Sequence, residues 1–361
     1  MELSLSQKKS YAKERLSAIQ AQRLAQEIAF GPIVFQVSRL MVKFGILQML
    51  AEHRHGLTME EIAEKSNLSK YAVQVLLESS LTIGTILLND DKFTLAKTGF
   101  FLLNDEMVKV NMNFNHDVNY LGLFDLEASL LKGKPEGLKV FGNWPTIYEG
   151  LSQLPDQVQQ SWFGFDHFYS DHSFEKALEI IFAHHPQKLL DVGGNTGRFA
   201  SKCVEYNPEV TVTIMDLPQQ LVMMKKAIET VSGKERILGH GANLLDSSIP
   251  FPKGFDAIWM SQFLDCFSEE QVINILSRAA RSMNRNCRLY IMETTWDRQH
   301  FETASFCLAQ TSVYFTALAN GNSKMFCSDD LKQYVQKAGL QIEKIYDEIG
   351  FGHSIFQCII S

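Results

Sequence analysis

The segment of residues 188–197 constrains the fold of this chain more than any other stretch. It reads Lys-Leu-Leu-Asp-Val-Gly-Gly-Asn-Thr-Gly, and apolar residues then recur with helical spacing at Phe199, Ala200 and Val204. A short apolar run that enters a helix through a tight glycine-rich turn is typical of the first unit of a nucleotide-binding α/β sheet. The sequence therefore predicts a ligand site at the end of this strand.

The glycines of the turn limit what can bind there. Gly193, Gly194 and Gly197 can adopt positive φ angles and let a ligand approach the backbone closely, and the following helix presents free N–H groups. A dinucleotide site expects G-x-G-x-x-G, but Asn195 stands two positions after Gly193, and Thr196 two positions after Gly194. The loop alone leaves two ligands open, a dinucleotide and S-adenosylmethionine.

Two acidic residues add to this pattern. Asp191 precedes the glycines, where an acid suits the cationic methionine end of a sulfonium ligand. Asp216 ends the next apolar run, and a carboxylate there can accept hydrogen bonds from two ribose hydroxyls in either type of site. Together with the loop, they predict a nucleotide-type ligand.

From residue 188 onward, strands and helices alternate, which predicts a parallel sheet with helices on both faces. The expected strands are Lys188–Val192, Val210–Met215, Arg236–Gly239, Phe255–Met260 and Arg288–Glu293, and the expected helices include Pro218–Val231 and Ser268–Met283. The tail differs, because Leu340–Ile349 and His353–Ile360 are separated only by a short turn. A terminal antiparallel hairpin on a parallel sheet is unlike a dinucleotide-binding domain.

The N-terminal part is mostly helical in pattern. Residues 4–30 predict a helix, and residues 33–50 form a second segment that is apolar on more than one face. Such a helix is buried on several sides, and we favour a dimer contact over the alternative of a helix central to its own domain.

Residues 57–98 read as helix, helix and hairpin, which is a winged-helix arrangement. Thr58 and Glu61 form a capping box that opens the first helix. The segment holds four lysines, no arginine and six acidic residues, a net charge of −2. Groove binding needs phosphate neutralisation, so we interpret the winged helix as a dimerising module and expect no nucleic-acid partner.

Composition sets outer bounds. A chain of 361 residues is long enough for two domains, and 45% hydrophobic with 21% charged residues is ordinary for a globular protein. The net charge of −7 again argues against nucleic acid. Six scattered cysteines without metal-ligand spacing indicate free thiols in a reducing cytoplasm and no metal site. The polar N-terminus and the lack of a long apolar run predict neither signal peptide nor membrane association.

Residues 105–175 are rich in aromatic side chains at helical spacing. Core packing explains most of them, but pockets favour the region between two domains. Trp162, Phe165 and Tyr169 are therefore candidates for the wall of a substrate pocket.

Over nearly its whole length the chain resembles the S-adenosylmethionine-dependent O-methyltransferases of the caffeic-acid and hydroxyindole type, which have bacterial relatives. The family loop D-V-G-G-G-T-G matches residues 191–197 with Asn195 in place of a glycine, and the family D-L-P motif matches residues 216–218. The resemblance implies a Rossmann-like class I methyltransferase sheet and a homodimer. It implies a winged-helix dimerisation domain over residues 1–104, a helical connector and substrate-pocket segment over 105–175, and a cofactor domain over 176–361.

The resemblance also implies which residues bind S-adenosylmethionine. They are Asp191, Gly193, Gly194, Asn195, Gly197, Asp216, Leu217, Asn243, Leu244, Ser261 and Gln262. Two of them depart from the family. Asn243 stands for an aspartate, although its side-chain carbonyl can still accept from the adenine amino group, and Ser261 stands for a lysine near the methionine carboxylate.

The largest departure concerns the catalytic base. The family segment W-x-x-H-D-W-S-D reads Gln-Phe-Leu-Asp-Cys-Phe-Ser-Glu over residues 262–269, which puts Asp265 in the position of the histidine. We take Asp265 as the candidate base and Glu293 as the residue that orients it; the alternatives are a turn residue and a strand-end acid. Asn115 resembles a pocket residue of the family and is a candidate substrate contact. A carboxyl is a weak base for a phenol unless it is buried or the phenol is acidic.

The function that we expect is methyl transfer to a hydroxyl of a small aromatic or polyene-type acceptor. Transfer to carbon or nitrogen, or a drifted decarboxylase or hydroxylase activity with the same cofactor, is the alternative that the missing histidine suggests. A ligand-sensing winged-helix regulator is a further alternative, against which the acidic winged helix argues.

Overall fold

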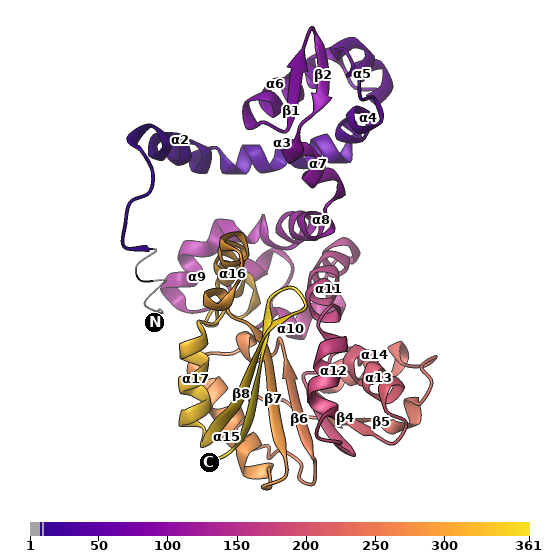
Figure 1. Ribbon diagram of the computed structural model, residues 1–361, viewed down its shortest axis with the longest axis vertical. Coiled ribbons are helices and arrows are strands. Elements are labelled where there is room, and N and C mark those ends of the chain that lie inside the picture. The colour runs from indigo at the N-terminus through magenta and orange to yellow at the C-terminus, as the bar shows by residue number, and fades with distance from the viewer. Residues whose placement is uncertain (1–7, 9–10) are drawn as a thin grey trace. The chain divides into compact units, whose positions relative to one another are not determined.

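A computed structural model describes residue 8 and residues 11–361 of the chain (Figure 1). Contacts between Cα atoms divide it into two compact units, with Tyr11–His116 forming the smaller one and Asp117–Ser361 lying in the larger one. The expected division into three segments, with boundaries at 104 and 175, stays a prediction beside this observed boundary.

The smaller unit is a winged helix with additional helices around it. Its helices are α2 (Ala18–Ala29), α3 (Gly31–Lys43), α4 (Ile46–Glu52), α5 (Met59–Ser66), α6 (Lys70–Ile83), α7 (Lys97–Asn104) and α8 (Glu106–Asn113), and its hairpin consists of β1 (Ile86–Asn89) and β2 (Lys92–Leu95). The predicted capping box is present, since Thr58 N–H donates to Glu61 at 2.7 Å and Glu61 N–H donates to Thr58 at 3.3 Å. The winged-helix prediction is confirmed.

The first helices differ from expectation. Part of the helix predicted over residues 4–30 lies outside the described residues, and residues 12–17 are not helical. The helix begins at Ala18 because Ser17 and Gln20 form their own capping box. The apolar stretch 33–50 is split at Gly45, which has a φ of 72°, and α3 and α4 are bent by 56°. Within the described part of the chain, no single helix could span a membrane, and only this bent pair passes by length and composition.

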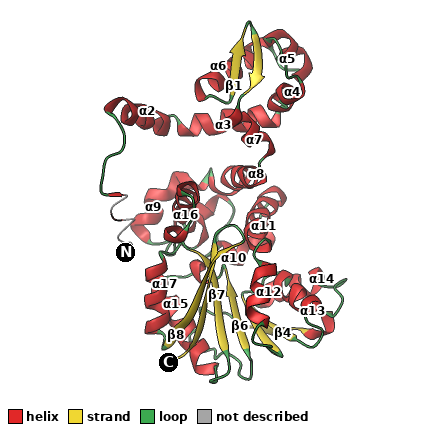
Figure 2. Cartoon of the chain, in the orientation of Figure 1, coloured by secondary structure: helices red, strands yellow, loops and turns green. Residues whose placement is uncertain are grey.

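The larger unit is built on a seven-stranded sheet, visible as arrows in Figure 2. The strands are β3 (Lys188–Val192), β4 (Thr211–Asp216), β5 (Ile237–Gly241), β6 (Ala257–Ser261), β7 (Arg288–Thr294), β8 (Leu340–Ile349) and β9 (His353–Ile360). They lie in the order β5-β4-β3-β6-β7-β9-β8, in which the first five are parallel and β9 and β8 are antiparallel. The predicted parallel sheet with a terminal hairpin is confirmed.

Helices cover both faces of this sheet because successive strand residues point to opposite sides. Leu189 packs into a core with residues of α12 (Phe174–Phe182) and α13 (Arg198–Tyr206). Leu190 packs into a second core with residues of α15 (Glu269–Ser282) and α17 (Ser328–Lys337). The helices of this unit are α9 (Leu126–Lys132), α10 (Ile147–Gly150), α11 (Asp156–Asp171), α12 (Phe174–Phe182), α13 (Arg198–Tyr206), α14 (Pro218–Ala227), α15 (Glu269–Ser282), α16 (Glu302–Tyr314) and α17 (Ser328–Lys337). The loops that follow the carboxyl ends of the parallel strands are where open α/β sheets bind their ligands.

Short helical turns connect these elements. They are η1 (Phe114–Asn119), η2 (Gly122–Asp125), η3 (Glu136–Val140), η4 (Leu151–Gln153), η5 (Lys234–Arg236), η6 (Leu264–Cys266), η7 (Trp296–Arg298) and η8 (Phe315–Ala319). Of these, η3, η4, η6 and the chain just after η8 contribute to the cavity described next.

Candidate active site

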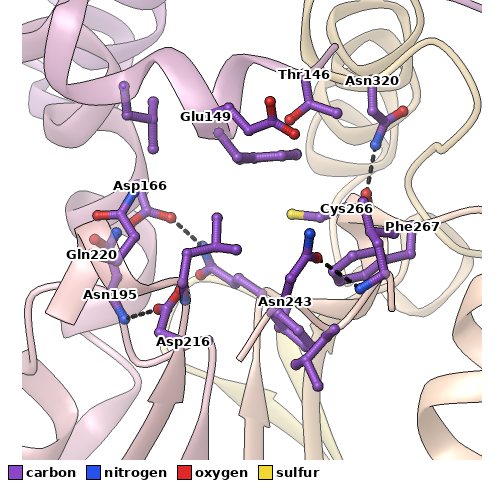
Figure 3. A pocket seen from close by; sticks show the side chains of 18 of the residues that line it. Thr146, Glu149, Asp166, Asn195, Asp216, Gln220, Asn243, Cys266, Phe267 and Asn320 are labelled. Carbon is purple, nitrogen blue, oxygen red and sulfur yellow. Dashed lines mark hydrogen bonds between the residues drawn. The ribbon is translucent and has the colours of Figure 1, made fainter. Parts of the chain in front are cut away.

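A cavity of about 1240 Å³ lies in the larger unit, where β3, β4, β5 and β6 end (Figure 3). Ligands of open α/β sheets bind at this edge, because the loops after the strands meet there. In Figure 3, Asp216 and Asn243 approach the cavity from the side of the sheet, while Thr146 and Glu149 approach it from the opposite side. We refer to these as the sheet side and the α10 side of the cavity.

The glycine loop after β3 has the backbone that the sequence suggested, with one exception. Gly193 and Gly197 have φ values of 74° and 79°, but Gly194 is not among the positive-φ residues. A glycine is required at position 194 for a steric reason instead, because a Cβ there would lie 2.6 Å from Asp191 Oδ2. Asn195 carries a positive φ of 49°, in the position where the family has a glycine. Gly197 does not line the cavity; its N–H donates to Gly194 O at 2.8 Å and closes the loop.

Asp216 is fixed by the backbone at the end of β4. Its Oδ2 accepts from Asn195 N–H at 2.9 Å and its Oδ1 accepts from Leu217 N–H at 2.7 Å. Burial raises the pKa of this carboxyl, and the two backbone donors oppose that rise. The second lone pair of each oxygen is free for a pair of hydroxyl groups, such as those of a ribose.

Asp191 is buried beneath the glycine loop. It is 2% exposed, and its Oδ2 has no hydrogen-bond partner among the described residues. Burial and, to a smaller extent, the neighbouring charge of Asp216 raise the pKa of Asp191 to about 8. A buried carboxyl oxygen without a partner is costly, so this atom is suited to a cationic donor that enters the cavity. Asn195 Oδ1 and Gln220 Oε1 are buried without a partner in the same described part of the chain.

Asn243 lies in the loop after β5 and has a defined amide orientation. Its Oδ1 accepts from Leu245 N–H at 3.0 Å, which leaves the Nδ2 group to face the cavity (Figure 3). The expected acceptor toward adenine is therefore partly used within the loop, and a donor faces the ligand. Leu244 lines the cavity next to it. The loop is held from α15 by Arg278, which donates to the backbone oxygens of residues 246 and 249 at 2.9 Å and to that of Leu244.

Ser261 and Gln262 line the cavity where β6 ends. Gln262 is held in place from two sides, since its Oε1 lies 2.6 Å from His353 Nε2 and its Nε2 donates to Asp166 Oδ1 at 3.4 Å. Burial lowers the pKa of His353 to about 4, so the ring is neutral at pH 7. Ser173 Oγ, 3.0 Å from His353 Nδ1, can donate to that nitrogen, and the ring then donates to Gln262 from Nε2.

Of the predicted substrate residues, the cavity is lined by Trp162, whose Nε1 donates to Tyr314 Oη at 2.7 Å. Phe165 and Tyr169 do not line it; their rings lie 5.0 Å apart on α11. Asn115 belongs to the smaller unit, and its predicted substrate contact stays a prediction.

The predicted base and its partner lie behind the cavity wall. Asp265 and Glu293 are 5% and 0% exposed, and neither lines the cavity, whereas Cys266 does. The Cys266 thiol donates to Asp265 Oδ1 at 3.5 Å. Glu293 Oε1 accepts from the backbone N–H groups of Phe263 and Leu264 at 3.1 and 2.7 Å. Burial raises the pKa of both carboxyls, and the charge of Asp265 raises that of Glu293 further, so the pair retains a proton.

Sequence reasoning missed several lining residues. Asp166, whose pKa burial raises to about 7, lies on α11 beside Gln262, and Tyr148 and Glu149 come from α10. The one sequence signal for the position of α10 is Gly150. The Trp144 ring packs against this residue, and a Cβ at Gly150 would lie 2.4 Å from the ring. Within the described residues, no three His, Cys, Asp or Glu side chains gather as a metal site.

Comparison with known proteins places this site in a family. The model of the O-methyltransferase domain matches residues 126–341, more than half of the chain, and that of the Dimerisation2-like domain matches residues 22–93. The chain belongs to the O-methyltransferase family. It is thereby an S-adenosylmethionine-dependent methyltransferase, which confirms the resemblance seen in the sequence.

Individual relatives are distant. An L-tyrosine C(3)-methyltransferase of Streptomyces lavendulae is 23% identical over 320 residues, covering 88% of this chain and 86% of the relative. A demethylspheroidene O-methyltransferase of Rhodobacter capsulatus is 23% identical over 320 residues, covering 87% and 75%. Among solved structures, the mitomycin 7-O-methyltransferase MmcR superposes with a TM-score of 0.71 at 17% identity, covering 94% of this chain and 98% of that one. This last likeness bears on the fold alone.

Proposed function

We propose that this methyltransferase moves the methyl group of S-adenosylmethionine to a hydroxyl oxygen of a small aromatic or polyene-type acceptor, and that it works as a homodimer. The observation that carries the proposal is the division of one cavity between groups that suit an adenosyl cofactor on the sheet side and aromatic rings on the α10 side. When bound, the cofactor supplies an activated methyl group on a good leaving group.

The sheet-side residues fit this cofactor. The free lone pairs of Asp216 suit the ribose hydroxyls, and the Nδ2 group of Asn243 suits a ring nitrogen of adenine. The partnerless Oδ2 of Asp191 and the part-buried carboxyl of Asp166 suit the ammonium group of the methionine end. Gly194 leaves the space between loop and carboxyl open, which a side chain would fill.

The α10 side holds the acceptor. The rings of Trp144 and Tyr148, in and next to α10, and of Trp162 on α11 line the cavity, which favours a flat apolar acceptor. Holding such an acceptor in line with the methyl group supplies up to about 7–11 kcal/mol of the barrier reduction, because methyl transfer requires alignment more than it requires chemical assistance.

The acceptor proton would leave toward the buried pair of Asp265 and Glu293. The Cys266 thiol lines the cavity and donates to Asp265, so it can receive the hydroxyl proton on sulfur while it passes its own proton to the carboxylate. Burial raises the pKa of the Cys266 thiol well above its usual value, so this group is not itself an anion. The raised pKa values of the carboxyl pair bring them closer to that of an acidic phenol, which improves proton transfer.

A second candidate is transfer to an aromatic carbon beside a hydroxyl. The relative from S. lavendulae carries a C-methyltransferase name over 88% of this chain. Loss of the hydroxyl proton activates both the oxygen and the neighbouring ring carbons, so the same carboxyl pair serves both reactions. The geometry of the acceptor on the α10 side then decides which atom receives the methyl group.

The homodimer is supported by the apolar surface of α2 and α3. Helix α2 has no buried residue, and its apolar side chains Ile19 and Ile28 are 79% and 69% exposed. Ile33 of α3 is 57% exposed. An apolar face of this kind on a unit matched by a dimerisation-like domain favours a second copy as its partner. Sedimentation should give twice the chain mass for the wild type. It should give a monomer, or a weakened dimer, for Ile28→Glu; a wild-type monomer would refute the proposal.

The activity is tested with methyl-labelled cofactor and a panel of phenols, naphthols and polyene alcohols. We expect S-adenosylhomocysteine to form together with a methylated product, whose NMR spectrum distinguishes an O-methyl from a C-methyl group. Cofactor binding without transfer to any of these acceptors would exclude the proposed acceptor class.

A further inference from the structure

A carboxylate on the α10 side has no role in the reaction described so far. Glu149 reaches into the cavity from α10, opposite Asp216 and Asn243 (Figure 3). No ion pair or side-chain hydrogen bond joins it to another of the residues that the structure describes, although it is only partly exposed. A charged group that faces a cavity without a partner is a candidate for ligand recognition.

The position of Glu149 is set by the packing of α10. Ile147 is fully buried, and the Trp144 ring lies against Gly150, where a Cβ would come within 2.4 Å of it. These two contacts fix one face of the short helix against the unit. Tyr148 and Glu149 consequently point from the other face into the cavity, where both are lining residues. The carboxylate is thus held at a defined place rather than at the end of a mobile loop.

No other charged residue of the wall that the structure describes forms an ion pair with Glu149. Three other charged residues of the wall are already paired, because Lys139 contacts Asp125 at 2.7 Å, Glu136 contacts Lys132 at 3.2 Å, and Arg198 forms an ion pair with Asp171.

The remaining acids of the wall, Asp166, Asp191 and Asp216, are grouped at the glycine loop and Gln262, where the cofactor fits. Lys134 is a lining cation that forms no ion pair within 4.0 Å in the described chain. Among the described residues, Glu149 is therefore a carboxylate without an ion pair in the acceptor half, whose lining includes the rings of Trp144, Tyr148 and Trp162. Apolar rings strengthen an ionic contact by excluding water.

We infer that the acceptor carries a protonated amine and that Glu149 binds this amine. The inference rests on the proposed transfer to an aromatic acceptor and specifies the substrate class: an aromatic hydroxyl compound with a basic nitrogen on a short side chain. In this arrangement the ring lies against Tyr148 and Trp162, the ammonium group donates to the Glu149 carboxylate, and the hydroxyl lies toward Cys266. Glu149 is a binding residue in this account and takes no proton from the reacting hydroxyl.

Three probes that differ only in charge test the inference: 4-(2-aminoethyl)phenol, the neutral 4-(2-hydroxyethyl)phenol and the anionic 3-(4-hydroxyphenyl)propanoate, each also made on a naphthol ring. Binding is measured by calorimetry to the protein saturated with S-adenosylhomocysteine, and KM and kcat are measured with S-adenosylmethionine. We expect the amine probes to bind most tightly. In Glu149→Gln they should lose roughly 10- to 100-fold in affinity, the range for one hydrogen bond between charged groups, while the neutral probes change little.

Two further variants control for folding and for charge. Glu149→Asp keeps the charge and should keep part of the amine preference. Glu175→Gln removes an exposed carboxylate of α12 and should leave the preference unchanged. Affinity for S-adenosylhomocysteine should be the same in all variants.

The outcomes separate the inference from the function on which it rests. If neutral and amine probes bind and react equally well, or if Glu149→Gln lowers kcat equally for all of them, the amine assignment is wrong and the methyl transfer stands. If no probe of any charge binds or reacts, the proposed acceptor class is refuted and the amine assignment with it.

Discussion

The glycine at position 194 offers the sharpest test of the cofactor site. Its backbone is outside the positive-φ region, so alanine fits the local conformation, unlike at Gly193 or Gly197. The only obstacle is contact: the new Cβ would lie 2.6 Å from Asp191 Oδ2, 2.9 Å from Asp191 Cγ and 3.0 Å from a methyl carbon of Ile214. Gly194→Ala is therefore a steric perturbation aimed at one carboxyl group.

The magnitude follows from how little room Asp191 has. The carboxyl is 2% exposed and cannot move aside without displacing the core, so overpacking should cost about 1–3 kcal/mol of unfolding free energy. A displaced carboxyl also loses its charged hydrogen bond to the ligand, worth about 1.5–3 kcal/mol. We therefore expect the affinity for S-adenosylmethionine to fall by roughly 10- to 100-fold, at about 1.4 kcal/mol per factor of ten.

Calorimetric titration and thermal unfolding measure the two effects separately. Gly164→Ala is the matched control, since Gly164 lies within α11 with nothing within 4 Å of an added Cβ. That variant should gain about 0.5–1 kcal/mol from helix propensity and keep wild-type affinity. Wild-type affinity and stability in Gly194→Ala would show that the loop does not press on Asp191 and would refute the argument.

Three other perturbations have defined outcomes. Because the pKa of Asp191 is about 8 in the free protein, a cationic ligand that needs this carboxyl ionised should bind with proton release, and the affinity for S-adenosylmethionine should rise with pH up to about pH 8. Calorimetry in two buffers measures the proton release, and Asp191→Asn should abolish the pH dependence. Arg278→Met removes the donor of three backbone oxygens in the Asn243 loop, so it should lower the free energy of unfolding in urea by about 2 kcal/mol or more and weaken S-adenosylhomocysteine binding. Unaltered binding would contradict the role of Arg278 in positioning this loop. Asp265→Asn should lower kcat by roughly 10²–10⁴ with unchanged S-adenosylhomocysteine affinity, and a smaller loss would remove it as the proton acceptor.

The parts of the fold that could be predicted are those in which local pattern and tertiary structure agree. β3, β8 and β9 have the predicted bounds, because each apolar run is flanked by glycine or turn residues. The start of α2 could not be predicted from periodicity, since apolar spacing continues upstream of the Ser17 cap. The break at Gly45 was hidden for the same reason, in a run that stays apolar on both sides.

The site residues that could be predicted are likewise those that the local sequence determines. Asp191 and Asp216 could be predicted because strand ends are encoded locally, next to the glycines and the D-L-P motif. Asp166 and His353 could not, because they reach Gln262 only through contacts that span 96 and 91 residues of sequence. The orientation of the Asn243 amide depends on a single backbone donor, Leu245 N–H, and the residue type alone suggested an acceptor where a donor faces the cavity.

The departures from the family pattern change how the methionine end of the cofactor is recognised. With Ser261 in place of the family lysine, the wall beside Gln262 offers a hydroxyl to the methionine carboxylate, a weaker donor than a cation. On the same sheet side, Asp166 and Asp191 present two carboxyls with raised pKa values, which become ionised most favourably when a cation is close. Recognition in this chain is therefore expected to depend on the ammonium and sulfonium charges of the cofactor more than on its carboxylate, because the cationic end finds the carboxyls of Asp166 and Asp191 while the family lysine is replaced by Ser261.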